Sequence, residues 1–350
     1  MGIKVRKPIN LPRPVYLLST ASVAGWDEGQ GPIGEEFDIL GDEGDTFGCD
    51  TWEKSESEMQ RLALSTAVSH AMLTDSDLDM IFAGDLLNQC VGSSYGLVSF
   101  KAPYLGLYGA CSTAAEGIML ASLMCGAYAE CAAAVTSSHN ASAERQFRFP
   151  LEYGGQRTPT AQWTVTGAGA FIFTSSKARL DRVAKKGFTV QVKDVMPGVA
   201  VDAGVHDANN MGAAMAPAAA DTVCTYLDSV QKMPELIVTG DLGSEGSHIL
   251  YDLTRAKGHD ISACHSDCGM IIYDRDGQDK HAGGSGCGCS AAVMSANILR
   301  AMRRGALKDV VFVGTGALMN SMSIQQGQSI PGIGHLVHFI SVPDGEIGGN

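Results

Sequence analysis

Cys111 has the setting in this sequence that best suits chemistry. It lies in the segment Gly109-Ala110-Cys111-Ser112-Thr113, between a strand-like run at 102–108 and an Ala-rich helical run. A cysteine at a strand-to-helix turn meets unpaired backbone amides and the positive end of the helix dipole, which lower the thiol pKa and favour a thiolate nucleophile. Because cysteine is among the most buried residue types, a structural role in the core is the alternative.

The overall charge restricts what else the protein can bind. The chain has 350 residues and a formal net charge of −13 at pH 7, which excludes a non-specific nucleic-acid partner. An anionic ligand must therefore be held by a local concentration of positive charge. The ten cysteines are scattered and several fall in apolar helix-like runs, as in proteins of a reducing compartment.

The elements that would position Cys111 occur twice along the chain. Two apolar strand-like segments, 79–86 and 235–242, both end in Gly-Asp-Leu, and their glycines, Gly84 and Gly240, are 156 positions apart. A fixed offset of this kind indicates two related structural units.

A second pair of segments follows in the same order. Cys111-Ser112 opens a helical run that leads to a strand at 131–136, and Cys289-Ser290 opens another that leads to a strand at 310–315. The repeat predicts a duplicated α/β architecture, with halves at residues 1–180 and 181–350 and helices on both faces of the sheets.

Two further patterns predict individual elements. Apolar residues spaced by three and four positions predict an amphipathic helix over 55–73, with Ser55 and Glu58 forming a capping box at its start. The most apolar stretch, 117–135, contains Glu130 and is rich in Ala, Gly and Cys, so we interpret it as a buried helix and strand rather than a membrane span.

These features resemble a known superfamily. The segment 109–114, the duplication, and the Gly-rich strand at 311–317 are similar to those of the thiolase/ketoacyl-synthase enzymes. The resemblance covers nearly the whole chain. It implies a five-layer αβαβα sandwich made of two similar halves, with Cys111 at the position of the acyl-carrying nucleophile.

The other catalytic groups of that superfamily match poorly. Condensing enzymes place a His where this chain has the segment 236–241, which contains none, and the Gly-rich loop 281–289 offers only His281. Acyl condensation needs a base or an oxyanion donor within reach of the reacting carbonyl. Two interpretations follow: a degenerate site without catalysis, or an acyltransferase in which Cys111 acts as nucleophile with help from His281.

A closer resemblance is carried by strings in both halves, at 83–89, 136–148, 152–156, 211–222 and 283–287. They are similar to the stage V sporulation protein AD family of spore-forming bacteria. The resemblance implies a non-catalytic protein that binds dipicolinic acid, alone or as its calcium chelate, for movement across the inner spore membrane during sporulation and germination. It also implies membrane channel proteins of the same system as partners.

A small planar dianion such as dipicolinate requires concentrated hydrogen-bond donors. Arg145 and Arg148 lie close in sequence to His139, and arginine forks suit carboxylates. Together with the helix start at Cys111, these residues form our predicted ligand-binding set. Ion pairs between the arginines and neighbouring glutamates are the structural alternative.

Asp202 and His206 complete the predicted set. They follow a strand of the second half, and Asp202 could supply a calcium-binding oxygen if the metal enters with the ligand. A simple turn residue is the alternative for Asp202. We expect no resident cofactor, and we interpret Cys264, Cys268, Cys287 and Cys289 as core cysteines rather than a metal site.

The N-terminus bears on localisation. Residues 1–7 are basic but are followed by prolines rather than an apolar core, so they do not form a signal peptide. We therefore expect a soluble protein of cytoplasmic type that lies at the periphery of the inner spore membrane. The superfamily resemblance adds the expectation of a homodimer.

Overall fold

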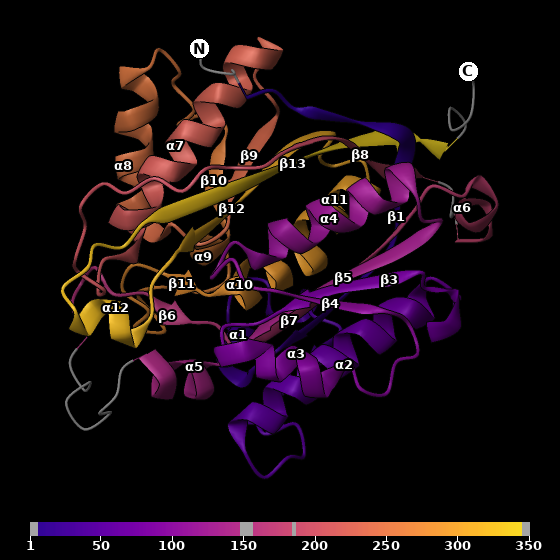
Figure 1. The fold of residues 1–350 in the computed structure, drawn as a ribbon, viewed down its shortest axis with the longest axis horizontal. Helices are drawn as coiled ribbons and strands as arrows, with labels where there is room; N and C mark the ends of the chain where they lie inside the picture. Colours follow the sequence, from indigo (N-terminus) through magenta and orange to yellow (C-terminus); the bar gives the residue numbers. More distant parts are fainter. Residues whose placement is uncertain (1–5, 148–156, 184–186, 345–350) are drawn as a thin grey trace.

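The computed structural model describes residues 6–147, 157–183 and 187–344 (Figure 1). Its strands in the first half are β1 (Ile9–Ala24), β2 (Ile39–Leu40), β3 (Met80–Gly84), β4 (Tyr104–Leu107), β5 (Cys131–Ser138), β6 (Trp163–Thr164) and β7 (Gly167–Thr174). The strands in the second half are β8 (Phe188–Met196), β9 (Leu236–Thr239), β10 (His265–Asp267), β11 (Gly284–Ser285), β12 (Asp309–Ala317) and β13 (Gly332–Pro343).

The same strand order appears in each half. The main sheet runs β4-β3-β5-β7-β1 and then β8-β13-β12-β9-β10. When the main-sheet strands of each half are numbered along the chain, without the short β2, each half reads third, second, fourth, fifth, first from its outer edge to the junction of the halves. The directions match as well, because the first and fifth strands, and the fourth and fifth, pair antiparallel in both halves while the others pair parallel. The duplication predicted from the Gly-Asp-Leu segments is therefore present in the fold.

Twelve α-helices lie within the described ranges. They are α1 (Trp26–Gly29), α2 (Trp52–His70), α3 (Val91–Gly96), α4 (Thr113–Ala127), α5 (Asn140–Phe147), α6 (Lys177–Val183), α7 (Met211–Val230), α8 (Gly243–Ala256), α9 (Cys268–Ile271), α10 (Cys287–Val293), α11 (Leu299–Arg303) and α12 (Ser321–Gln325). A π-helical turn, Met294–Ile298, joins α10 to α11, and short 3-10 turns occur at Gly34–Glu36, Asp75–Asp77 and Asn88–Cys90.

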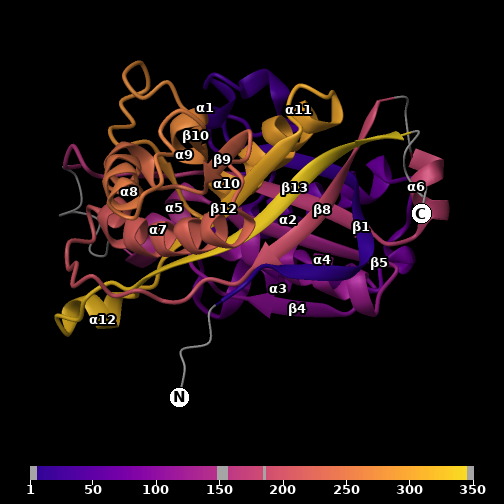
Figure 2. The same ribbon diagram turned by 90° about the horizontal axis from the view of Figure 1, so that it is seen from above.

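The helices form three layers with the two halves of the sheet between them. Helix α2 packs against the first half of the sheet, helix α7 packs against the second half, and α8 packs on α7. Helices α4 and α10 lie in the middle, where α4 contacts strands of both halves (Figures 1 and 2). This is the five-layer αβαβα arrangement expected from the sequence.

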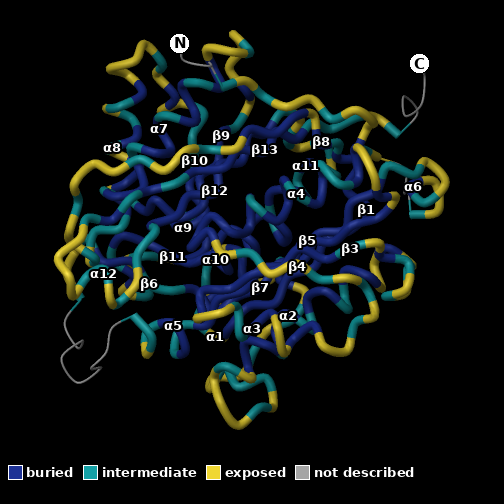
Figure 3. The backbone as a smooth tube through the Cα atoms, viewed as in Figure 1, coloured by how far each residue is buried: buried dark blue, intermediate teal, exposed yellow. Residues whose placement is uncertain are grey.

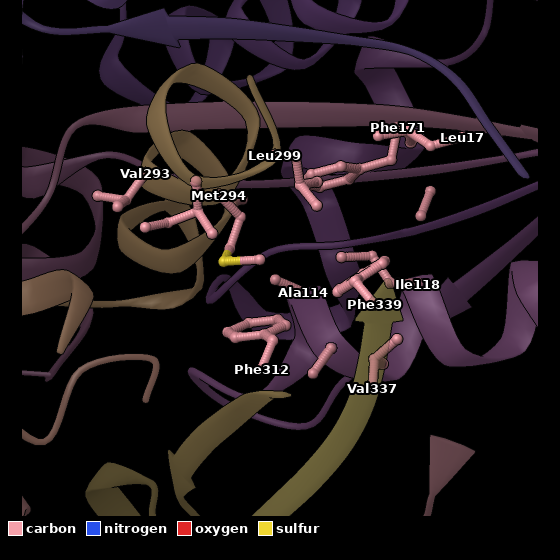
Figure 4. Packing of buried hydrophobic residues seen from close by; sticks show 14 of the residues in the cluster. Leu17, Ala114, Ile118, Phe171, Val293, Met294, Leu299, Phe312, Val337 and Phe339 are labelled. Atoms are coloured by element: carbon pink, nitrogen blue, oxygen red, sulfur yellow. The ribbon is translucent and has the colours of Figure 1, made fainter. Parts of the chain in front are cut away.

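The main core lies around the central layer. Ala114 and Ile118 of α4 pack in one buried cluster with Phe171 of β7 and with Phe312 and Phe339 of β12 and β13 (Figure 4). The central elements are mostly buried, whereas exposed segments are concentrated on the periphery (Figure 3). The apolar stretch 117–135 forms most of α4 and the first part of β5, which confirms its interpretation as a core segment.

Helix α2 begins earlier than predicted. Its N-cap is Thr51, whose hydroxyl accepts a hydrogen bond from the Lys54 amide, so the predicted capping box at Ser55 is wrong. Ser55 lies inside the helix and is buried, and its hydroxyl donates to the carbonyls of Thr46 and Thr51. The preceding loop accounts for the difference, because it supplies an acceptor that keeps the serine within the first turn.

The two halves are joined through β1 and β8. These strands pair antiparallel, with Ile9 opposite Val195 and Val15 opposite Val192, so one continuous sheet folds around the central helices. On its other side β1 pairs with β7, and that register shifts between Leu17 and Ser19. The shift marks a β-bulge, which leaves backbone groups of β1 outside the regular ladder.

Candidate functional site

Cys111 lies at the turn between β4 and α4, as the sequence predicts. The preceding residue, Ala110, has a φ of +51°, a left-handed conformation that is costly for a residue with a Cβ atom. Local hydrogen bonds hold this turn: the Thr113 hydroxyl donates to the Ala110 carbonyl at 2.6 Å, and the Ser112 hydroxyl donates to the Gly109 carbonyl at 2.7 Å. The backbone is therefore fixed in the conformation that presents Cys111.

A cavity of about 90 Å³ lies in front of Cys111 and draws its lining from both halves. Its walls are mostly apolar, and Glu144 is the one charged side chain among the lining residues that the structure describes. The lining residues are Leu86, Tyr108, Ala110, Cys111, Ala143, Glu144, Phe147, Thr164, Ala208, Asn209, Met211, Ser285, Ala317 and Met319.

Asp241 is the functional residue that the sequence analysis missed. It follows β9, is fully buried, and accepts a hydrogen bond from the Cys111 thiol. The Gly286 amide donates to its Oδ2 at 2.9 Å and the Thr315 hydroxyl to its Oδ1 at 2.8 Å. The Ser285 hydroxyl donates to Oδ2 at 3.0 Å and lies 3.9 Å from the Cys111 sulfur. A carboxyl group thus stands beside the thiol.

The electrostatics around Cys111 oppose a thiolate. Burial raises the pKa of the Cys111 thiol well above its usual range, and the nearby charge and hydrogen bond of Asp241 raise it further. The prediction that the start of α4 lowers this pKa is therefore wrong, because desolvation and the carboxyl group outweigh the helix dipole. Burial also raises the pKa of Asp241, although its hydrogen bonds offset part of that effect.

A second thiol, Cys287, belongs to the same buried cluster as Cys111, Leu86 and Ala143. Its sulfur donates to the Ser137 carbonyl at 3.0 Å, and burial raises its pKa well above the usual range. All ten cysteines are unpaired, and Cys268 and Cys289 are buried as well. The described residues contain no group of three or more His, Cys, Asp or Glu side chains placed to hold a metal ion.

His139 and Arg145 do not reach the cavity, contrary to the prediction that they share a pocket with Cys111. Ala143, Glu144 and Phe147 form the face of α5 that lines it, so Arg145 lies on the opposite side of the helix. There Arg145 pairs with Glu53 and lies over the Trp52 ring, 5.3 Å from its centre.

The His139 ring is bound to backbone instead of to a ligand. It is buried, with Nε2 3.0 Å from the Asp45 carbonyl and Nδ1 accepting from the Ala141 amide at 3.2 Å. Burial lowers the pKa of His139, which keeps the ring neutral. Arg148 lies outside the described residues.

Asp202 and His206 also lie away from the cavity, on an exposed loop. Asp202 accepts hydrogen bonds from the Ser329 hydroxyl at 2.6 Å and the Gly204 amide at 2.9 Å, which lower its pKa and match its alternative interpretation as a turn residue. The end of the same loop does reach the cavity, through Ala208 and Asn209.

His281, the candidate assistant in an acyl transfer, is likewise not a lining residue of the cavity. Its Nδ1 lies 2.8 Å from the Thr158 carbonyl and its Nε2 lies 3.0 Å from a carboxylate oxygen of Asp279. Both ring nitrogens therefore have partners in a loop, and no described lining residue of the Cys111 cavity is a histidine.

Comparisons with known proteins identify the family to which this chain belongs. The family model described as "Stage V sporulation protein AD (SpoVAD)" matches residues 5–340. The chain belongs to the SpoVAD family. It is 41% identical over 332 residues to the stage V sporulation protein AD of Bacillus subtilis (strain 168), covering 93% of this chain and 94% of the relative.

Solved structures with the same fold are thiolase-like enzymes. Acetamide-bound OleA of Xanthomonas campestris matches with a TM-score of 0.59 and 13% identity, over 94% of this chain and 99% of OleA. Human mitochondrial 3-ketoacyl-CoA thiolase in complex with CoA matches with a TM-score of 0.56 and 12% identity, over 94% and 99%. At this identity the likeness establishes the thiolase fold of the SpoVAD chain and nothing about its chemistry.

One helical window of the SpoVAD chain, Ala110–Ala127, is long and apolar enough to cross a membrane. This window includes α4, and 72% of it is buried inside the protein. The window therefore has the properties of the central helix of a folded α/β protein.

Proposed function

We propose that this sporulation protein is a non-catalytic member of the thiolase fold that binds dipicolinic acid in the cavity in front of Cys111. The observation that carries the proposal is the Asp241 carboxyl group beside the thiol. A carboxyl group there suppresses the thiolate that acyl transfer requires, and the described lining of the cavity has no imidazole to act as a base.

The charge of the cavity favours the calcium chelate over the free dianion. Among the described lining residues there is no Lys, Arg or His to pair with a dianion, so a ligand whose charge is already cancelled suits this lining better. In a one-to-one chelate, calcium cancels the two ligand charges. Oxygen atoms of Glu144, Thr164 and Asn209 line the cavity and are of the type that calcium prefers.

The family supplies the physiological context of this proposal. We infer that the bound acid is handed to membrane channel proteins of the same sporulation system and crosses the inner spore membrane. The protein would then act at the periphery of that membrane, as a binding protein rather than an enzyme.

Calorimetric titration with dipicolinate, with and without calcium, tests the proposal. Ala208→Trp should fill the cavity and weaken binding by about tenfold or more, a loss of about 1.4 kcal/mol. Ala203→Trp is the matched control, because Ala203 is exposed on the same loop and does not line the cavity. Glu144→Gln should weaken binding of the calcium chelate more than binding of the free acid. Absence of binding under both conditions would contradict the proposal.

The acyltransferase alternative predicts a covalent product. Incubation with an acyl-coenzyme A, followed by intact-mass and peptide mass spectrometry, should leave Cys111 unmodified if the thiol is held neutral. A stable acyl adduct on Cys111, lost in Cys111→Ser, would instead support acyl transfer.

We also infer that the protein forms a homodimer through β4. Within the described part of the chain this strand ends the sheet and pairs with β3 alone. It carries the exposed Leu105, and the exposed apolar residues Tyr95, Val98 and Tyr108 lie close to it in the sequence. An exposed apolar edge strand pairs readily, and two copies of one edge are complementary across a twofold axis. Light scattering should give a dimer mass for the wild-type chain and a monomer mass for Leu105→Lys.

A further inference from the structure

A second cavity, of about 440 Å³, shares no lining residue with the Cys111 cavity. It is enclosed by β1, the ends of α2 and α6, the start of β8, and α11. The described lining residues are Leu18, Ser19, Thr20, Asp38, His70, Leu180, Val183, Gly187, Phe188, Thr189, Arg300, Arg303, Arg304 and Asp344. Helix α10 begins beside Cys111 and α11 ends at this cavity, so the two sites lie at opposite ends of one helical run.

Positive charge gathers in this cavity although the protein as a whole carries −13. Arg300, Arg303 and Arg304 project from a single helical turn, since positions three and four apart share a helix face. Arg300 is engaged by Asp38. Among the described residues, Arg304 has one distant partner, a Glu36 carboxylate oxygen at 3.9 Å, and its side chain is 62% exposed.

Arg303 has the least compensated charge of the three. Its Nη2 donates to the carbonyl of Leu17, at 2.9 Å, and to that of Leu18, the residue that the β-bulge leaves outside the register. Its Nε and Nη1 have no acceptor, and its guanidinium has no ion-pair partner, within the described parts of the chain. Burial lowers the pKa of Arg303, which reflects the cost of holding this charge away from water.

The other lining residues limit the polarity and the charge of an anion that could bind in this cavity. Leu18, Leu180, Val183 and Phe188 form apolar walls, which suit an apolar or aromatic body. The carboxylates of Asp38 and Asp344 limit the negative charge that the cavity tolerates. Asp344 is held by the Thr189 hydroxyl, which donates to its Oδ1 at 2.8 Å.

We propose that this cavity is a second binding site, for a small organic carboxylate with an apolar body, whose carboxylate pairs with the guanidinium groups of Arg303 and Arg304. Guanidinium forks match carboxylates in geometry. The Asp344 carboxylate acts on Arg303 as a nearby charge, and the ligand would add a carboxylate hydrogen-bonded directly to the guanidinium. The site stands independently of the function proposed for the Cys111 cavity.

Titration with benzoate and isophthalate, monitored by calorimetry, tests this site in the full-length protein. Arg304→Gln changes a mostly exposed side chain and should weaken binding by about tenfold without affecting folding. Arg303→Lys should weaken it further, because an ammonium group cannot form the bidentate pair. Arg255→Gln, which changes a surface arginine on α8 outside the cavity, should leave binding unchanged.

Ala208→Trp separates the two sites, because it fills only the Cys111 cavity. Loss of benzoate and isophthalate binding in Ala208→Trp, with binding retained in Arg304→Gln, would overturn the second site. No detectable binding of either probe would also overturn it, and inorganic phosphate binding as tightly as the carboxylates would overturn the assigned ligand class.

Discussion

The second strand of each half ends in the same dipeptide, Gly-Asp, yet the two carboxyl groups serve different ends. In the first half, Asp85 is buried and accepts hydrogen bonds from the Ser93 amide at 2.7 Å and the Leu87 amide at 2.9 Å. It therefore fixes the loop that leads into α3. In the second half, Asp241 receives its bonds from a different set of elements and faces the Cys111 thiol. The aspartate therefore occupies the same position in both halves, and the residues that it contacts determine its role.

Each of these carboxyl groups has a second buried carboxyl group nearby. The charge of Asp85 acts on Glu56 of α2, where burial and that charge raise the pKa of Glu56 to about 8. The charge of Asp241 acts on Asp267 of β10, where burial and that charge raise the pKa of Asp267 to about 7. Both halves thus hold an acidic group whose pKa lies near neutral, Glu56 or Asp267, beside the aspartate of the repeat. Only in the second half does that aspartate, Asp241, also lie against a thiol.

The largest expected effect tests whether Asp85 is structural, and the comparison would break if it were not. Asp85→Ala should lower the free energy of unfolding by about 3 kcal/mol, because it leaves buried donors of Ser93 and Leu87 without an acceptor. Urea unfolding measures the change. Asp260→Ala, which removes an exposed turn aspartate, should leave the free energy of unfolding nearly unchanged. Equal effects of the two substitutions would refute the structural role.

The role of Asp241 can be sharpened through the reactivity of Cys111. Asp241→Asn removes the charge beside the thiol, so the pKa of Cys111 should fall and alkylation by iodoacetamide should accelerate about tenfold at pH 8. Peptide mapping would assign the label to Cys111, and Cys111→Ser would give the background. An unchanged rate would mean that burial alone keeps the thiol neutral.

The smallest expected effect concerns the pH dependence of stability. The folded protein keeps the Glu56 proton up to about pH 8, whereas the unfolded chain releases it near the ordinary value of 4.5. The folded state therefore binds more protons in that window, and the contribution of Glu56 makes stability fall as pH rises through it. Glu56→Gln should gain stability relative to wild type by about 1 kcal/mol between pH 6 and pH 7. A constant difference across that range would contradict the raised pKa.

The sequence predicted the features that depend on repetition and local pattern. The spacing of Gly84 and Gly240 anticipated two halves with one strand order, and the strand-to-helix turn at Cys111 is where it was expected. Apolar periodicity located α2, although the start of α2 depended on a hydrogen bond from Ser55 to a loop residue, which periodicity does not contain.

The composition of the site could not be predicted in the same way, because it depends on which helix face meets the cavity. Arg145 and Phe147 are two positions apart, and only the second faces Cys111. Asp241 was visible as the end of the repeated Gly-Asp-Leu segment. Its contact with a cysteine 130 positions away, Cys111, depends on how the halves pack. The repeated dipeptide was the signal that could have identified it.

The backbone pairing of β1 with β8 has a consequence for how a ligand enters. Since these strands are hydrogen-bonded across the junction and α4 contacts both sides of the sheet, the halves cannot swing apart like a hinged clamshell without breaking main-chain bonds. Access to the interior must then rely on rotation of rim side chains such as Met211 and Met319, which are long and flexible. Uptake and release by this protein should accordingly proceed without any large change in its hydrodynamic radius.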